Sequence, residues 1–187
     1  MRIVAGKNKG RALIAPPGED TRPTLGRARQ SLFDILEHGK FSASGESLLP
    51  GAKVLEAFAG SGAFAFEALS RGAGFATLID TSRAAQDAQR RNAAALGEIK
   101  SCRILGGDAT QPPKGEAQDL VFLDPPYHSA LAPRALVALA AAGWIGAETL
   151  CIVELSSKEN AALPDGFTVL DERRYGPAKF VFVKLGA

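Results

Sequence analysis

Residues 53–71 read KVLEAFAGSGAFAFEALSR, and this stretch decides the fold class. Residues 54–58 are apolar apart from Glu56 and have the length of a buried strand, whereas residues 63–71 have the length and composition of a helix. Gly60 and Gly62 between them allow the backbone to turn sharply and to approach a ligand closely. The stretch therefore predicts a strand, a glycine loop and a helix, which together open an α/β fold.

The same alternation continues along the sequence. Further strands are predicted at residues 75–80, 102–105, 120–123 and 149–155. One further helix is predicted between a cap at Thr81 or Ser82 and a stop at Gly97, and another at residues 130–142. Residues 167–173 and 179–185 are predicted to form an antiparallel hairpin at the end of the sheet. The pattern predicts a mostly parallel, doubly wound sheet with helices on both faces.

Residues 1–38 are predicted to form a separate extension before this fold. Two short apolar segments, at residues 3–5 and 12–14, flank a turn-rich connector and predict a small β-hairpin. Thr24 is predicted to cap a helix with apolar side chains at helical spacing. Residues 39–52, rich in Gly and Ser, are the expected linker to the α/β domain at residues 53–187.

The charge of the chain is distributed unevenly. Residues 1–30 hold seven basic and two acidic side chains, a net charge of +5, whereas the whole chain carries +2. A basic arm on a mildly acidic body suits a polyanionic partner that is met by one end of the molecule. A solvated basic tail explains the charge equally well, so charge alone leaves the two interpretations level.

Length and composition predict one hydrophobic core. The chain has 187 residues, 46% of them hydrophobic, which is enough for a single domain-sized core. The sequence predicts no signal peptide and no membrane-spanning segment. Cys102 and Cys151 lie in apolar runs without ligand spacing, which favours reduced core thiols over a disulfide or a metal site. We therefore expect a monomeric, cytoplasmic protein that binds no metal.

A carboxylate before the glycine loop narrows the choice of cofactor. Residues 60–65 also fit the G-x-G-x-x-A fingerprint of dinucleotide-binding folds, so the loop alone is ambiguous. Glu56 suits the ammonium and sulfonium of S-adenosylmethionine better than a pyrophosphate. Asp80 ends the second strand and is placed to accept ribose hydroxyls of either cofactor. Asp108 is a weaker candidate for an adenine contact, because Asp after two glycines is also typical of a turn.

Residues 124–127, Asp-Pro-Pro-Tyr, follow an apolar strand and indicate the reaction. Exocyclic amines of guanine and adenine are poor nucleophiles, because their lone pair is delocalised into the ring. The Asp124 carboxylate and a backbone carbonyl, held rigid by Pro125 and Pro126, suit the two N–H bonds and would orient the lone pair. Tyr127 offers a flat face on which a base stacks. The motif therefore predicts methyl transfer to a base amine.

Over essentially its whole length the sequence resembles the bacterial RsmD family, the small-subunit ribosomal RNA guanine-N2 methyltransferases. The residues that carry the resemblance are Arg22-Pro23-Thr24, Arg27, Arg29, Leu32-Phe33, residues 56–62, residues 67–73 and residues 124–127. The resemblance implies a Rossmann-like methyltransferase fold, with a seven-strand sheet whose final strand is antiparallel, and an N-terminal extension that helps to hold RNA. Gly26 and Gln30 depart from the family, in which an acid and a glutamate are usual.

Together, the motifs and the resemblance predict methylation of guanine N2 in ribosomal RNA, within an assembling or assembled small subunit. The residues expected to bind S-adenosylmethionine are Glu56, Phe58, Gly60, Ser61, Gly62, Asp80 and Asp108. The expected catalytic residues are Asp124, Pro125, Pro126 and Tyr127, and the expected RNA contacts are Arg22, Thr24, Arg27 and Arg29. The alternatives are an adenine-N6 methyltransferase of another nucleic acid, a nicotinamide-dependent oxidoreductase and a non-catalytic RNA-binding module. If the protein were an oxidoreductase, residues 124–127 would have no function.

Overall fold

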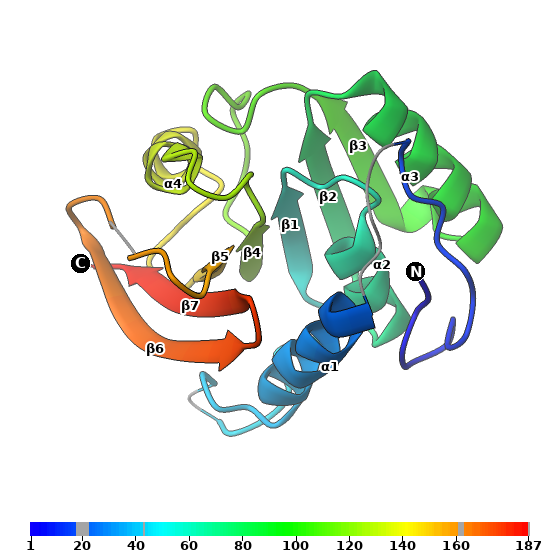
Figure 1. The fold of residues 1–187 in the computed structure, drawn as a ribbon, viewed down its shortest axis with the longest axis horizontal. Coiled ribbons are helices and arrows are strands. Elements are labelled where there is room, and N and C mark those ends of the chain that lie inside the picture. Colours follow the sequence, from blue (N-terminus) through cyan, green and yellow to red (C-terminus); the bar gives the residue numbers. More distant parts are fainter. Residues whose placement is uncertain (18–22, 43, 161–162, 187) are drawn as a thin grey trace.

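The structure, a computed structural model, describes residues 1–17, 23–42, 44–160 and 163–186. Within these residues, seven strands form one sheet in the order β3-β2-β1-β4-β5-β7-β6 (Figure 1). The strands are β1 (Lys53–Ala57), β2 (Phe75–Asp80), β3 (Cys102–Gly106), β4 (Leu120–Leu123), β5 (Leu150–Ser156), β6 (Phe167–Tyr175) and β7 (Ala178–Leu185). The helices are α1 (Pro23–Glu37), α2 (Ala63–Ser70), α3 (Arg83–Leu96) and α4 (Leu131–Ala141), with a 3-10 turn, η1, at Ile99–Ser101.

The predicted alternation and the mixed seven-strand sheet are confirmed. β1 to β5 pair in parallel, and β7 lies antiparallel between β5 and β6. β2 and β4 have the predicted bounds, and the other strands differ from theirs by one or two residues. Ser82 caps α3, because its hydroxyl accepts a hydrogen bond from Ala85 N at 3.3 Å, and Gly97 ends the helix with a φ of 76°.

Hydrophobic clusters cover both faces of the sheet, as predicted. On one face α1 and α2 pack around Phe33, Phe64 and Phe122, whose successive rings stack with centroids 5.1 and 4.5 Å apart. On the other face α4 packs with Trp144, apart from the other three helices in Figure 1. No helix within the described residues is long and apolar enough to cross a membrane.

The predicted N-terminal β-hairpin is present but short. Ile3 N donates to Arg11 O at 3.0 Å and Leu13 N donates to Met1 O at 3.0 Å, on either side of an antiparallel bridge between Arg2 and Ala12. The backbone N–H groups of Val4 and Ala5 donate to the carboxylate of Glu67 at 2.8 and 3.0 Å, so a neighbouring strand cannot use them. The segment is therefore anchored by a side chain of α2.

The prediction that Thr24 caps α1 is wrong. The helix begins at Pro23 and includes Thr24 in its first turn. Proline is favoured at the first helical position, because the N–H that it lacks would have no helical partner there. The residue before the helix, Arg22, lies outside the described residues.

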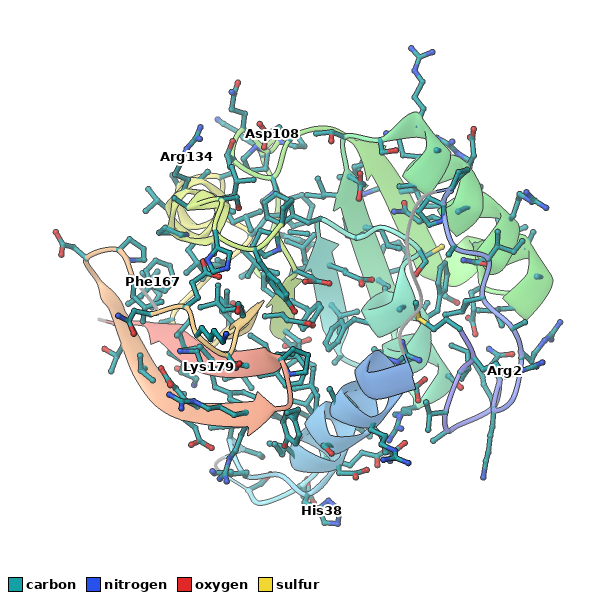
Figure 2. The ribbon with its side chains drawn as sticks, viewed as in Figure 1. Arg2, His38, Asp108, Arg134, Phe167 and Lys179 are labelled. Atoms are coloured by element: carbon teal, nitrogen blue, oxygen red, sulfur yellow. The ribbon has the colours of Figure 1, made fainter. Side chains whose placement is uncertain are left out.

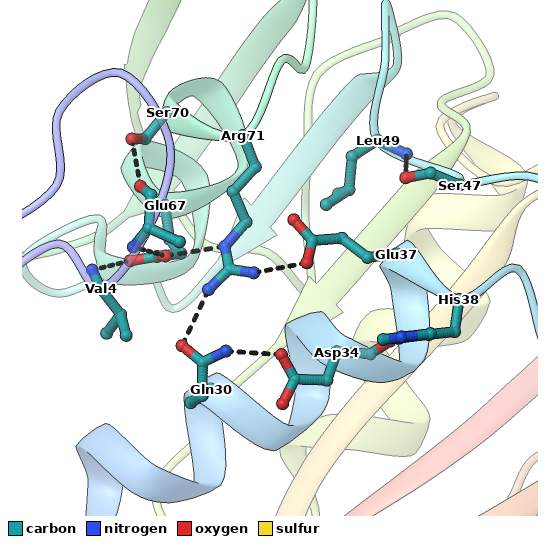
Figure 3. A network of polar contacts seen from close by, with 11 residues as sticks. Val4, Gln30, Asp34, Glu37, His38, Ser47, Leu49, Glu67, Ser70 and Arg71 are labelled. Atoms are coloured by element: carbon teal, nitrogen blue, oxygen red, sulfur yellow. Dashed lines mark hydrogen bonds and ion pairs between the residues drawn. The ribbon is translucent and has the colours of Figure 1, made fainter.

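A buried arginine joins α1 to α2 (Figure 3). Arg71 forms ion pairs with Glu67 at 2.8 Å and with Glu37 of α1 at 2.9 Å, and it donates to Gln30 Oε1 of α1 at 3.0 Å. Its guanidinium also lies 4.9 Å from the ring centroid of Phe33. The Arg71 side chain is 1% exposed, and buried charges hold their geometry when they are paired in this way. The network sets how α1 lies on the sheet.

Candidate active site

A cavity of about 520 Å³ opens at the carboxyl ends of the central strands. In open α/β sheets ligands bind at these ends, where the strand order reverses. Here the reversal lies between β1 and β4, because β2 and β3 continue on one side and β5 on the other. The lining residues come from the loops after β1 to β4, from β5 and β7, and from α1. The site predicted by the fold class and the cavity therefore coincide.

The glycine loop joins β1 to α2 at the edge of this cavity. Gly62 has a φ of 77°, and a Cβ there would lie 2.5 Å from a leucine side chain of β2, so a larger residue does not fit. Two side chains of α3 donate hydrogen bonds to backbone carbonyl groups of the loop. Gln89 Nε2 donates to Gly60 O at 2.9 Å, and Asn92 Nδ2 donates to Ser61 O at 3.0 Å.

Glu56 of β1 is buried and accepts hydrogen bonds from the start of α2. Phe64 N and Ala65 N donate to its two carboxylate oxygens at 3.1 and 2.9 Å. Burial raises the pKa of Glu56 to about 8, although these two hydrogen bonds and the positive charge of Arg29 act in the opposite direction. A carboxyl group with this pKa is mostly neutral at pH 7, and a cation beside it favours the ionised form.

Asp80 ends β2 and also binds the backbone of the glycine loop. Its Oδ2 accepts a hydrogen bond from Gly60 N at 2.8 Å, and its Oδ1 accepts one from Ser82 N at 2.8 Å. A carboxylate oxygen has room for a second donor. Asp80 can therefore position the loop and still receive hydroxyl groups of a ligand.

Five of the seven residues predicted to bind the cofactor line the cavity together: Glu56, Phe58, Gly60, Ser61 and Asp80. Gly62 shapes the loop without lining the cavity. Asp108 does not line it either, although Gly107 and Ala109 do. Asp108 Oδ1 accepts a hydrogen bond from Thr110 N at 2.8 Å, which is typical of a turn. Figure 2 shows Asp108 at the end of the sheet towards which β1 and β2 run.

Residues 124–127 border the neighbouring part of the same cavity. Asp124 N donates to Ala57 O at 3.3 Å, which ties the motif to the end of β1. Pro125 is buried, whereas Asp124 and Tyr127 are exposed. The Tyr127 hydroxyl donates to Glu154 Oε1 at 3.2 Å. The structure thus places the predicted catalytic motif beside the glycine loop.

Glu154 of β5 is a second buried carboxylate of the cavity, and the sequence motifs do not single it out. The residue is 6% exposed. Burial raises the pKa of Glu154, whereas the hydrogen bond from Tyr127 and the charge of Arg29 lower it. The sequence does contain one signal for it, because Glu154 is an acidic residue near the end of an apolar strand, as Asp80 and Asp124 are.

Arg29 is buried in α1 rather than lying on an exposed basic arm. The residue is 9% exposed and lines the cavity, and its Nη2 donates to Arg2 O at 2.8 Å. Burial lowers the pKa of Arg29, and the negative charges of Glu67 and Glu56 oppose this effect. Arg29 therefore supplies a positive charge inside the cavity.

The other predicted RNA contacts are placed differently. Arg27 is exposed, two residues before Arg29. Arg22 and the side chain of Thr24 lie outside the described residues. Arg27 is therefore the one member of this set that the described part of the chain presents to solvent.

Comparisons with known proteins agree with this architecture. A family model described as Conserved hypothetical protein 95 matches residues 1–184. The ribosomal RNA small subunit methyltransferase D of Escherichia coli is 36% identical over 162 residues, which cover 86% of this chain and 76% of that protein. The protein of the same name from Haemophilus influenzae is 30% identical over 181 residues, which cover 94% of this chain and 89% of that protein.

A solved structure of a putative methyltransferase from Escherichia coli superposes with a TM-score of 0.81 and 32% identity, covering 100% of this chain and 98% of that chain. A putative methylase from Haemophilus influenzae superposes with a TM-score of 0.77 and 26% identity, covering 100% and 98%. The likeness therefore spans the N-terminal residues as well as the α/β fold. The chain belongs to the family of Conserved hypothetical protein 95, and it is a methyltransferase of the RsmD family.

Proposed function

We propose that this enzyme transfers the methyl group of S-adenosylmethionine to the exocyclic N2 amine of a guanine in small-subunit ribosomal RNA. The observation that carries the proposal is the meeting of two motifs in one cavity, the glycine loop with Glu56 and the residues 124–127. The names of the relatives from Escherichia coli and Haemophilus influenzae support ribosomal RNA as the substrate.

The part of the cavity beside the glycine loop is called the cofactor part. Its residues fit S-adenosylmethionine better than a dinucleotide. Glu56 and Asp80 bring two carboxyl groups to this part of the cavity. A pyrophosphate would oppose the ionisation of such groups, whereas the cationic end of S-adenosylmethionine favours it. Glu56 would face the cationic end of the cofactor, and Asp80 would accept the ribose hydroxyls. When bound, the cofactor supplies an electrophilic methyl group on a positively charged sulfur.

Residues 124–127 would hold the acceptor base. Asp124 would accept one N–H of the amine and a backbone carbonyl of the motif the other, so that the nitrogen lone pair points at the methyl group. Tyr127 would stack on the base. No strong general base is needed, because the methylated ammonium is acidic and loses its proton readily.

The N-terminal residues 1–38 would contribute the RNA contacts. Arg27 is exposed on α1, and arginines at such positions bind phosphates without reading sequence. A short arm and one helix offer few contacts that could read a base sequence. The enzyme would therefore rely on the shape of its target RNA, which a folded small-subunit particle supplies. We expect it to act as a monomer in the cytoplasm.

The experiment offers purified enzyme and methyl-labelled cofactor to naked ribosomal RNA, to reconstituted small-subunit particles and to adenine-containing duplex DNA. We expect label in N2-methylguanosine, strongest with particles. Label in N6-methyladenine would overturn the proposal, whereas stronger labelling of naked RNA would remove only the preference for particles. Calorimetry with S-adenosylhomocysteine and with NAD separately tests the cofactor, and tighter binding of NAD would contradict it.

A further inference from the structure

Glu154 lies in the part of the cavity farther from the glycine loop. In the sheet, β4 separates β5 from β1 and β2, whose ends carry Glu56 and Asp80. Glu154 therefore lies with Tyr127 in the part of the cavity that is proposed to hold the base that receives the methyl group. The proposed function gives this buried carboxylate no role.

Strand register places Glu154 beside the catalytic carboxylate. β4 and β5 pair in parallel with Leu123 opposite Val153, so Asp124 and Glu154 are the next residues on neighbouring chain segments. Paired strands lie about 4.8 Å apart, and successive side chains alternate between the faces of a sheet. Leu123 and Val153 face the α4 side, so the alternation directs the two carboxylates to the α1 side, where the cavity lies.

Two neighbouring acceptors match one edge of guanine. Guanine presents two kinds of donor side by side, the N1–H and the N2 amine. Adenine presents an amine beside an unprotonated N1, which is an acceptor. A carboxylate that faces N1 therefore attracts guanine and repels adenine.

We infer that Glu154 determines the base specificity of the enzyme by accepting the N1–H of the target guanine while Asp124 accepts from its amine. The inference rests on the proposed function. Burial raises the pKa of Glu154 and so opposes its ionised, accepting form. Two neighbours favour that form, namely the Tyr127 hydroxyl, which donates to it at 3.2 Å, and the positive charge of Arg29 in the same cavity. Asp124 alone does not separate the two bases, because both carry an amine.

The test uses a base analogue that keeps the amine and loses the N1–H together with the O6 carbonyl, so the N1 contact is judged from the difference between wild type and Glu154→Gln. Mass mapping first locates the methylated guanosine, and particles are then rebuilt from ligated RNA with guanosine or 2-aminopurine riboside at that position. We expect wild-type enzyme to methylate guanosine at least about 10²-fold faster, because a site built to bind a donor rejects an analogue without it. In Glu154→Gln the ratio should fall to about 10 or less, because the Gln amide also donates to an unprotonated N1.

One control variant and one binding measurement separate specificity from structure. Glu148→Gln is the matched control, because this glutamate has a 96% exposed side chain whose ion pair is with Lys184 at 3.4 Å; it should keep the wild-type ratio. The affinity of Glu154→Gln for S-adenosylhomocysteine should match that of wild type, which shows that the cofactor part is intact.

The outcomes distinguish this inference from the proposed function. If wild-type enzyme methylates guanine N2 and Glu154→Gln keeps the wild-type ratio, the inference alone is overturned. The same holds if wild type accepts both bases equally. If wild type methylates another base or another atom, the proposed function fails and the inference with it.

Discussion

Glu56 should make cofactor binding depend on pH. Its pKa in the free enzyme is about 8, so about nine in ten molecules carry the neutral form at pH 7. The cationic end of the cofactor favours the ionised form, so binding should release the proton. Because the raised pKa keeps the group protonated at low pH, affinity should increase with pH. The opposite slope would follow if the pKa were depressed.

The magnitude follows from the one proton that is released. Below pH 7 the association constant should increase nearly tenfold for each pH unit, because the ionised fraction of Glu56 does so. Above about pH 8 affinity should fall again, because the α-amino group of the cofactor, with an ordinary pKa of about 7.7–8.0, loses its charge. At pH 7 binding should release about 0.9 proton.

The assay is calorimetry with S-adenosylmethionine between pH 6 and pH 7, in two buffers whose ionisation heats differ. The observed heat should depend on the buffer for wild type and not for Glu56→Gln, whose affinity should also be flat over this range. Glu116→Gln is the control, because its carboxylate pairs at 3.1 Å with Lys53 and its side chain is 73% exposed. A flat wild-type profile refutes the reasoning. An unchanged slope in Glu56→Gln assigns the proton to another group, such as Glu154.

Four further predictions test other parts of the molecule. Asp124→Ala should slow single-turnover methyl transfer by about 10²-fold or more and leave most of the cofactor affinity, since its acceptor aligns the amine; near wild-type rates would exclude this role. Asp80→Ala should weaken cofactor binding about tenfold, because each hydrogen bond to a charged group contributes about 1.5–3 kcal/mol, partly replaced by water; an unchanged dissociation constant would mean that Asp80 only organises its own loops. Arg27→Ala should reduce the slope of log affinity against log salt by about 0.7, as expected for one lost phosphate contact on single-stranded RNA. Arg29→Ala should leave that slope unchanged and lower the melting temperature, because Arg29 is buried; a lower slope would place Arg29 on the RNA.

The elements that the sequence predicted well are those decided by local patterns. The apolar run of β4 is buried along all four residues. The hydroxyl of Ser82 and the left-handed Gly97 bound α3 as their residue types indicate. The glycine loop could be recognised because Gly62 needs both a positive φ and the space that a Cβ would fill.

The features that the sequence did not reveal depend on contacts between distant residues. The N-terminal hairpin is short because the carboxylate of Glu67, more than 60 positions away, accepts hydrogen bonds from the N–H groups of Val4 and Ala5. Arg29 and Arg27 are arginines only two positions apart, and the sequence does not show which of them is buried. Only the packing of α1 on the sheet buries Arg29 and leaves Arg27 exposed. Hydrophobic periodicity reports which face of a helix is apolar, not which charged residue lies over a cavity.

The proposed methyl acceptor is a guanine amine of small-subunit ribosomal RNA. It can be tested by mass mapping of modified nucleosides in ribosomal RNA from cells that lack the gene and carry either the wild-type chain or Asp124→Ala. We expect one N2-methylguanosine to disappear without the gene, and only the wild-type chain to restore it. An unchanged set of N2-methylguanosines, or the loss of an N6-methyladenosine in its place, would contradict the proposed function.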